Sequence, residues 1–310
     1  MINNENISDS EIRVIGVDSR QSKPANRRLW VIVAVAAVAA VLALVLWLAP
    51  WLGRHTMVED GTSAFEQQPV VQSHPLREWI AGIDSLTAVG TLTRDLTVND
   101  IPLRVYAPLN STPHLEVGYG VADHRERSIL FFQAADVRAD NGGIVGAFVL
   151  QGKPLSRGLS KRGYCAIIGD KVSVGVADNS PLFEQATDEN GDFFRQYPLV
   201  DNGQLVENEL KNKSVRRGLC ELEGRIVVVE SQTPESLHDF AQALVDIGVS
   251  QAIYLVGSSA MAWSVDLEGN GTKMGLWDER VYKNISFIVW PNPSPVTPNP
   301  PPGSPTQAKP

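Results

Sequence analysis

The sequence has few of the side chains that bind transition metals or act as activated nucleophiles. It contains five histidines and two cysteines, and no two histidines stand at the spacing of metal ligands. It has no HExxH, CxxC or Walker pattern, and the run GSSAM that begins at Gly257 is not the GxSxG turn of serine hydrolases. These absences disfavour a zinc hydrolase or a serine esterase of the usual kind. We expect neither a metal nor a cofactor.

Positive charge is also scarce. The chain has 27 Lys and Arg against 35 Asp and Glu, which gives a formal net charge of −8. The sequence shows no basic stripe that could follow a phosphate backbone. We therefore expect no nucleic-acid partner.

One uncharged apolar run stands out, between residues 29 and 52. About 20 apolar residues in a helix cross the hydrocarbon core of a bilayer, so this run is long enough to span. A cleaved signal peptide is the alternative, but its apolar region is shorter, about 7–15 residues, and starts nearer the N-terminus. We predict a retained transmembrane helix, with the lipid bilayer as a partner.

The charges that flank this run predict its orientation. The N-terminal side carries Arg20, Lys23, Arg27 and Arg28, whereas Arg54 and His55 follow the run. The positive-inside rule keeps the more basic side in the cytoplasm. We therefore predict a cytoplasmic tail over residues 1–28 and export of the chain from residue 53 onward.

The two cysteines, Cys165 and Cys220, both fall in the part that we predict to be exported. An oxidising compartment would let them form one disulfide. Two buried, unpaired thiols are the alternative, and the sequence does not separate these. We favour the disulfide.

The exported part divides by composition into three stretches. Residues 53–78 show no sustained period and are interpreted as a linker. Residues 79–290 are predicted to form one folded domain. Residues 291–310 are rich in proline and are predicted to form an extended, disordered tail, which could engage a partner in the cell envelope.

Within the domain, short β-branched runs alternate with turn residues, and clear helical patterns are few. We predict an α+β domain with mixed or antiparallel sheets. The runs that predict strands cover residues 92–100, 102–108, 128–137, 143–150, 165–169, 171–177 and 225–231.

The most legible unit is a β-α-β pattern between residues 225 and 259. A short apolar strand over residues 226–230 precedes a helix, for which Thr233 is the predicted N-cap and Pro234 the first residue. Gly248 is predicted to end the helix, and a strand over residues 252–256 follows. If the two strands are parallel neighbours, their crossover is right-handed. Ligands bind beyond the carboxyl ends of strands in such units.

Three segments carry residues that could bind or react. Gly257, Ser258 and Ser259 follow the β-α-β unit, where backbone N–H groups and hydroxyls could hold an oxyanion or sugar hydroxyls. The other segments are Asp140 with Asn141, Gly142 and Gly143, and the pair Arg216 and Arg217 just before a strand. Arginine suits phosphate because its planar fork donates two parallel hydrogen bonds. The alternatives are plain turns for the glycine-containing segments and solvated surface arginines for the pair.

Together these segments resemble the phosphodiester glycosidase family. Members of that family have an Asn-Gly-Gly turn after a strand and an arginine before a strand, and their last strand ends in Tyr-Leu-Asp-Gly followed by serines. The matching stretches here are 141–143, 152–155 (GKPL), 196–203 (QYPLVDNG), Arg216 or Arg217, 239–241 (DFA) and 254–259 (YLVGSS). The resemblance covers residues 98–263.

The resemblance implies roles for these residues. Arg216 or Arg217 would hold the phosphate, Asn141, Gly142, Gly257 and Ser258 would bind the sugar, and Asp140, Ser258 and Ser259 are the catalytic candidates. Val256 stands where the family has its aspartate. Glycoside cleavage relies on carboxylates, so either Asp140 or Asp201 replaces that acid or the domain binds without turnover.

The sequence thus predicts a membrane-anchored, phosphodiester glycosidase-like protein that acts on or binds a sugar-1-phosphodiester or another envelope glycan. The resemblance is closest to bacterial members, which implies the inner membrane with the domain in the periplasm. If active, the protein would be a hydrolase. A catalytically silent glycan-binding module and a structural envelope protein are the alternatives.

Overall fold

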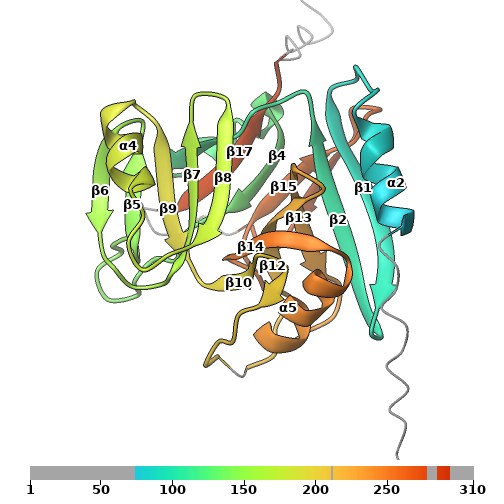
Figure 1. The fold of residues 1–310 in the computed structure, drawn as a ribbon. Coiled ribbons are helices and arrows are strands. Elements are labelled where there is room, and N and C mark those ends of the chain that lie inside the picture. Colours follow the sequence, from blue (N-terminus) through green and yellow to red (C-terminus); the bar gives the residue numbers. More distant parts are fainter. Residues whose placement is uncertain (1–73, 211, 278–284, 294–310) are drawn as a thin grey trace, which may run out of the picture. The chain divides into compact units, whose positions relative to one another are not determined.

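The structure is a computed structural model that describes residues 74–210, 212–277 and 285–293. The described part contains three sheets, and every strand pair in them is antiparallel (Figure 1). This confirms the predicted α+β class in its antiparallel form. The seven-stranded sheet has, in spatial order, β1 (Gly90–Val98), β2 (Ile101–Leu109), β13 (Arg225–Ser231), β12 (Arg217–Leu222), β14 (Val249–Leu255), β10 (Pro198–Asp201) and β11 (Gln204–Leu205).

Two five-stranded sheets complete the set. The first has, in spatial order, β16 (Gly271–Met274), β15 (Ala262–Val265), β4 (Ser128–Gln133), β17 (Ser286–Pro291) and β3 (His114–Val117). The second has β6 (Lys153–Arg157), β5 (Ala147–Leu150), β9 (Asp192–Gln196), β7 (Gly163–Ile168) and β8 (Lys171–Val176). The described helices are α2 (His74–Ile83), α3 (Gly120–Asp123), η1 (Arg125–Arg127), α4 (Leu182–Asp188) and α5 (Leu237–Asp246).

The seven-stranded sheet separates two apolar cores. Side chains alternate along a strand, so Leu103 and Val105 of β2 face the core that α2 and α5 cover, whereas Tyr106 faces the opposite core. That second core is shared with β4 and β17 of one five-stranded sheet and with β7 and β9 of the other. Smaller clusters under α3 and α4 cover the outer faces of these sheets. The three sheets therefore meet around this second core.

The β-α-β pattern is present, with two differences from the prediction. β12 lies between β13 and β14 and pairs antiparallel with both, so these two strands run parallel but are not neighbours. The predicted N-cap at Thr233 is wrong: Ser236 caps α5 by accepting a hydrogen bond from the Asp239 N–H. The chain between β13 and α5 pairs instead with an earlier segment, through the Ser214–Glu235 bridge. Gly248 ends the helix with a φ of 88°.

Helix α2 begins within the stretch that the sequence predicts to be a linker. Its Leu76, Ile80 and Ile83 are buried in the helix-covered core. The spacing of these residues places them on one helical face. Among the described helices, none is long and apolar enough to cross a membrane. The predicted span at residues 29–52 lies outside the described residues.

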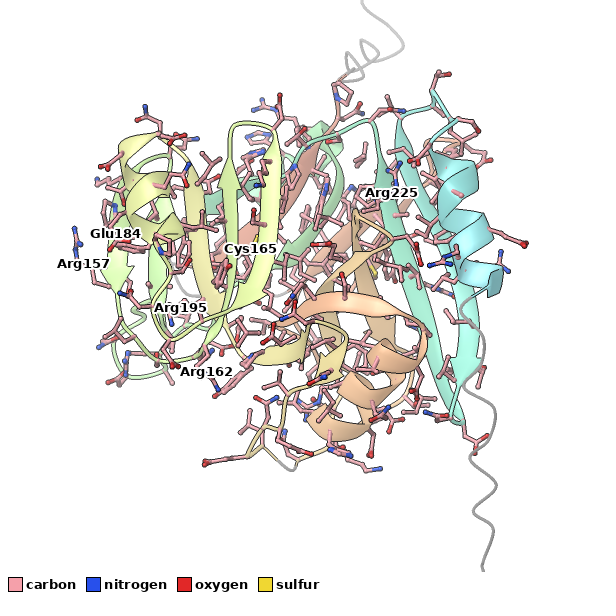
Figure 2. The ribbon with its side chains drawn as sticks, in the orientation of Figure 1. Arg157, Arg162, Cys165, Glu184, Arg195 and Arg225 are labelled. Atoms are coloured by element: carbon pink, nitrogen blue, oxygen red, sulfur yellow. The ribbon has the colours of Figure 1, made fainter. Side chains whose placement is uncertain are left out.

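The predicted disulfide is wrong in this structure, because both cysteines are free thiols. Cys220 of β12 lies in the helix-covered core, whereas Cys165 of β7, labelled in Figure 2, lies in the core on the other face of the seven-stranded sheet. A disulfide requires the two side chains to face each other at short range, whereas these two belong to different cores. Two buried thiols, the alternative that the sequence left open, describe the molecule.

Candidate functional site

Two of the three sequence-predicted segments meet in space. Arg217 begins β12 opposite Leu255 at the end of β14, and the Ser258 N–H donates to the Val215 carbonyl at 2.8 Å. A Cβ on Gly257 would lie 2.3 Å from that carbonyl oxygen, so glycine is required where the two segments cross. The turn of Gly257, Ser258 and Ser259 is therefore packed directly against the segment that leads into the two arginines.

Arg217 is held inside the protein and has 1% of its surface exposed. Its Nε lies 2.5 Å from Oε2 of Glu230, and its Nη1 donates to the carbonyls of Ala260 at 2.7 Å and Val256 at 3.4 Å. The guanidinium also lies over the Phe132 ring. In this geometry the planar fork fixes the end of β14 and the turn after it. Arg217 thus acts as a positioning residue.

Arg216 points to the other side of the strand and is also buried. Its Nε donates to the Glu235 carbonyl at 2.8 Å, and its Nη2 donates to the Asn212 carbonyl. Its guanidinium carbon lies 5.9 Å from the centre of the Tyr254 ring. The Tyr254 hydroxyl in turn accepts a hydrogen bond from the Gly257 N–H at 3.1 Å. Arg216 and the turn are therefore joined through Tyr254.

A cluster of polar side chains continues from Tyr254. We name Asp136, Lys161, Gln196, Tyr197 and Tyr254 the junction cluster. The rings of Tyr254 and Tyr197 have their centres 6.4 Å apart, and Nζ of Lys161 lies 4.5 Å from the centre of the Tyr197 ring. The same Nζ pairs with the Asp136 carboxylate and donates to Oε1 of Gln196 at 2.9 Å.

The members of the junction cluster differ in their exposure. The Lys161 side chain is 5% exposed and the Asp136 side chain 33% exposed, so the carboxylate is the member of this pair that solvent reaches. Burial lowers the pKa of the Lys161 ammonium, although the Asp136 charge opposes this shift. Burial, and then the nearby Asp136 and Tyr254, raise the pKa of the Tyr197 hydroxyl. The cluster thus combines a reachable carboxylate with a shielded ammonium.

All three sheets supply residues to the junction cluster. Asp136 follows β4 of the first five-stranded sheet, Gln196 ends β9 of the second, and Tyr254 lies near the end of β14 in the seven-stranded sheet. The Val256 N–H donates to the Gln133 carbonyl at 3.1 Å, which joins the end of β14 to the end of β4. The ends of β4, β9 and β14, one from each sheet, therefore lie together at the junction cluster.

Two residues of this region adopt left-handed backbone conformations. Lys161 has a φ of 70° and Ser258 a φ of 55°. Such conformations are uncommon outside glycine, asparagine and aspartate, and they concentrate at functional sites. Ser258 and Ser259 are exposed. Their hydroxyls are therefore accessible to a ligand.

The loop with Asp140, Asn141 and Gly142 follows Asp136 of the junction cluster in the chain. The Asn141 Oδ1 accepts from the Gly143 N–H at 2.8 Å, and the Gly142 N–H donates to the Arg138 carbonyl at 2.9 Å. This is the plain turn that the sequence allowed as an alternative. The carbonyl of Asp136 accepts from the Val145 N–H, so the loop begins at the junction cluster, and Asp140 and Asn141 are exposed residues of this loop.

Asp201 lies at the far end of β14 from the turn. It belongs to the tight hairpin between β10 and β11, where the Gly203 N–H donates to the Ser250 carbonyl at 2.8 Å. Ser250 and Leu255 are five positions apart in a strand that rises about 3.3 Å per residue, which separates them by roughly 16 Å. Asp201 therefore does not supply the missing carboxylate at the turn.

Sequence reasoning missed the two charged members of the junction cluster. Asp136 had no clear signal, because the apolar run predicted a strand over residues 128–137, whereas β4 ends at Gln133 and leaves Asp136 in the connection after it. Lys161 had none, since it lies in an irregular connection before β7. Gln196 and Tyr197 belong to the motif at residues 196–203, but the sequence indicated no role for them.

Within the described residues, no group of three or more His, Cys, Asp or Glu side chains could hold a metal ion.

Comparisons with known proteins give a weak likeness at the level of fold. No protein-family model matches the chain, and no curated protein matches it. One similar solved structure is the zebrafish N-acetylglucosamine-1-phosphodiester alpha-N-acetylglucosaminidase catalytic domain, auto-inhibited by its pro-peptide. It has 14% sequence identity and a TM-score of 0.46, over 65% of this chain and 82% of that one. A hypothetical protein from Synechocystis has 11% identity and a TM-score of 0.46, over 66% of this chain and 62% of that one.

Proposed function

We propose that the described domain binds glycosyl phosphodiesters beside the junction cluster and hydrolyses them, with Asp136 as the general base. One observation carries the proposal. A partly exposed carboxylate, paired with a shielded ammonium, lies at the same junction of strand ends as the exposed serine turn. The family motifs in the sequence supply the substrate class, and the geometry supplies a carboxylate in the region where Val256 replaces the motif aspartate.

Hydrolysis of a glycosyl phosphodiester requires one carboxylate near the anomeric carbon of the sugar. Hydrolysis breaks the bond between that carbon and the phosphate oxygen, and water adds its hydroxyl to the sugar. A phosphate monoester leaves readily, so the more useful role for Asp136 is to take the proton of the attacking water. In this proposal Ser258 and Ser259 orient the sugar hydroxyls. The two buried arginines hold the turn in place rather than contacting the phosphate.

The assay is release of free sugar from a synthetic glycosyl phosphodiester by the purified full-length protein in mild detergent. Release that follows enzyme concentration supports the proposal. Val256→Asp restores the family aspartate at a partly exposed position, so it should be at least as active. A wild-type protein and a Val256→Asp variant that both release no sugar would sink the enzymatic proposal.

A non-catalytic glycan-binding module is the second candidate, and Val256 itself favours it, because valine cannot transfer a proton. In that case the wild type binds the glycosyl phosphodiester in equilibrium dialysis without consuming it. Gain of turnover in Val256→Asp would then identify a site that has lost one acid. Turnover by the wild type would exclude this candidate.

We also propose that residues 29–52 anchor the protein in a bacterial inner membrane with the domain in the periplasm. The uncharged run and the basic residues before it support this topology. Reporter fusions after residue 293 test it, since alkaline phosphatase folds only when exported. Activity of a cytoplasm-specific reporter at the same position would contradict the proposal.

A further inference from the structure

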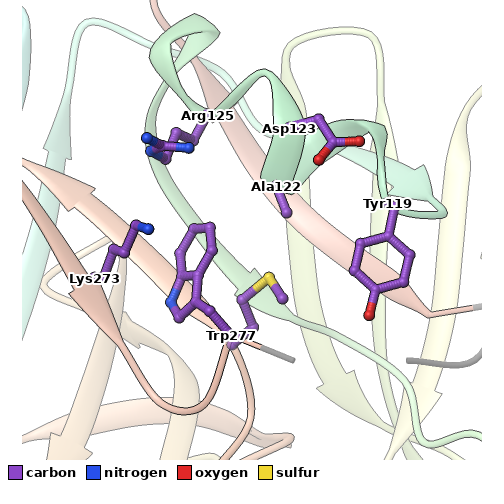
Figure 3. Close-up of a pocket in the computed structure, with 7 residues that line it drawn as sticks. Tyr119, Ala122, Asp123, Arg125, Lys273 and Trp277 are labelled. Atoms are coloured by element: carbon purple, nitrogen blue, oxygen red, sulfur yellow. The ribbon is translucent and has the colours of Figure 1, made fainter. Parts of the chain in front are cut away.

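A pocket of about 410 Å³ lies on the first five-stranded sheet, apart from the junction cluster, and Figure 3 shows it. This volume is in the range of small-molecule sites, about 300–1,000 Å³. The lining residues are Tyr119, Ala122, Asp123, Arg125, Met261, Lys273 and Trp277. The proposal below depends on these residues and not on the hydrolytic function.

The positive charges of the pocket gather on one tryptophan. The guanidinium carbon of Arg125 lies 5.9 Å, and Nζ of Lys273 4.7 Å, from the centre of the Trp277 ring. Neither cation forms an ion pair with a carboxylate of the described residues. Contacts with an aromatic face leave the N–H donors able to bind an anion. With Asp123 as the acid in the lining, the pocket carries +2 − 1 = +1, in a chain whose formal net charge is −8.

The aromatic wall is fixed before any ligand arrives. The Trp277 indole N–H donates to the Met274 carbonyl at 3.1 Å, and its ring packs against Phe131 and Trp263 at 6.0 and 6.4 Å between centres. Arg125 also lies 5.6 Å from the centre of the Trp263 ring. A wall held by its neighbours in this way loses little conformational entropy when a ligand binds.

The lining as a whole selects a ligand with two properties. Arg125 and Lys273 attract a negative group, whereas Asp123 repels a bare anion and accepts hydrogen bonds from hydroxyls. Tyr119 and Met261 add less polar surface for the body of the ligand. A phosphate ion lacks the hydroxyl-bearing body, and a neutral sugar lacks the charge. An anionic sugar has both.

The wall of the pocket is hydrogen-bonded to the serine turn. Met261 follows the turn by two residues, and the Leu276 N–H beside Trp277 donates to the Ser259 carbonyl at 2.8 Å. A Cβ on Gly275 would lie 2.0 Å from the Ala260 carbonyl oxygen, so the wall is in tight contact with this segment.

We propose that this pocket is a binding site for an anionic sugar, a hexose that carries a phosphate or carboxylate group. The negative group lies between Arg125 and Lys273, and the sugar hydroxyls donate to Asp123. Phosphate and carboxylate groups both accept hydrogen bonds and carry negative charge, so either could bind the two cations. The experiment tests the two kinds of anionic sugar separately.

Isothermal titration calorimetry of the full-length protein in mild detergent tests the site with glucose 6-phosphate, glucuronate, glucose and inorganic phosphate. The two anionic sugars should bind at least about tenfold more tightly than glucose or inorganic phosphate, since each control lacks one set of contacts. Equal affinity for glucose, or for inorganic phosphate, would overturn the proposal. So would tighter binding of adenosine monophosphate, which would indicate a nucleotide site.

Variants connect the binding to the pocket. Arg125→Gln and Lys273→Gln should each weaken glucose 6-phosphate by about tenfold. Asp123→Ala should weaken glucose 6-phosphate but strengthen inorganic phosphate, a reversal that a general loss of folding cannot produce. Arg127→Gln and Lys171→Gln are matched controls, because both residues are exposed and lie outside the lining. Unchanged binding in Lys273→Gln, or equal losses in the controls, would contradict the assignment.

Discussion

The guanidinium of Arg217 and the carboxylate of Glu230 form a buried ion pair between β12 and β13, with 2.5 Å between Nε and Oε2. Two carbonyls beyond the end of β14 share the same guanidinium. The pair therefore holds three segments together at the edge of the candidate site. Because both groups are buried, the loss of either partner leaves an uncompensated charge in the interior.

Arg217→Leu should lower the free energy of unfolding by about 3–5 kcal/mol, since the buried Glu230 carboxylate then loses the cation that pairs with it and keeps only hydrogen bonds from Tyr106 and Gln232. Urea unfolding followed by circular dichroism measures the change. Arg104→Leu is the matched control: Arg104 binds Asp95 with two hydrogen bonds, but that pair is exposed on β1 and β2. The control should cost about 1 kcal/mol or less. Similar losses in both variants would contradict a special role for Arg217.

Gly257→Ala should destabilise the protein by about 1–3 kcal/mol, because the new Cβ would lie 2.3 Å from the Val215 carbonyl oxygen and the backbone must move. Gly82→Ala is the control, since Gly82 lies in α2 with no atom within 4 Å of its ideal Cβ. That substitution should be neutral or stabilising by up to about 1 kcal/mol. A neutral Gly257→Ala would mean that the turn is not tightly packed.

Lys161 predicts a pH dependence of stability. Its pKa is lowered from the ordinary 10.5, so between the lowered pKa and 10.5 the folded state binds fewer protons than the unfolded chain. Stability rises with pH wherever the unfolded state binds more protons. The free energy of unfolding of the wild type, minus that of Lys161→Met, should therefore increase as pH rises toward 10.5. Lys171→Met, at an exposed position, is the control. A difference that falls over this range would contradict the burial of the ammonium.

The free cysteines make a prediction for chemical labelling. Burial raises the pKa of both the Cys165 and the Cys220 thiols, so little reactive thiolate forms in the folded protein. Iodoacetamide should modify neither residue quickly under native conditions. In denaturant without a reducing agent, mass spectrometry should find two adducts per chain. If the denatured protein takes up label only after reduction, the two cysteines form a disulfide and the prediction of free thiols is wrong.

The sequence predicted local structure better than long-range pairing. The runs over residues 102–108, 165–169 and 225–231 correspond to strands β2, β7 and β13, because β-branched alternation and turn residues act locally. The insertion of β12 between β13 and β14 could not be predicted, since that order depends on contacts between segments far apart in the chain. The Thr233 cap failed for a similar reason, because residue 235 pairs with Ser214.

In the candidate site, too, the sequence indicated local motifs but not contacts between distant segments. The motif series included Gly257 and Ser258, and the structure places Ser258 against the segment that leads into the two arginines. The charged pair of Asp136 and Lys161 brings together residues from two different connections. Such a pair is set by how the sheets pack on one another, and a single sequence carries no local signal for it.

The identity of the working carboxylate tests the central claim most directly. We would measure the rate of sugar release from a glycosyl phosphodiester for the wild type and for Asp136→Asn, Asp140→Asn and Asp201→Asn. Loss of a positioned acid–base group costs about 10²–10⁴-fold in rate, and we predict that loss for Asp136→Asn with nearly unchanged substrate binding. Asp201→Asn should retain the wild-type rate. A fully active Asp136→Asn, or a loss confined to Asp140→Asn or Asp201→Asn, would contradict the account.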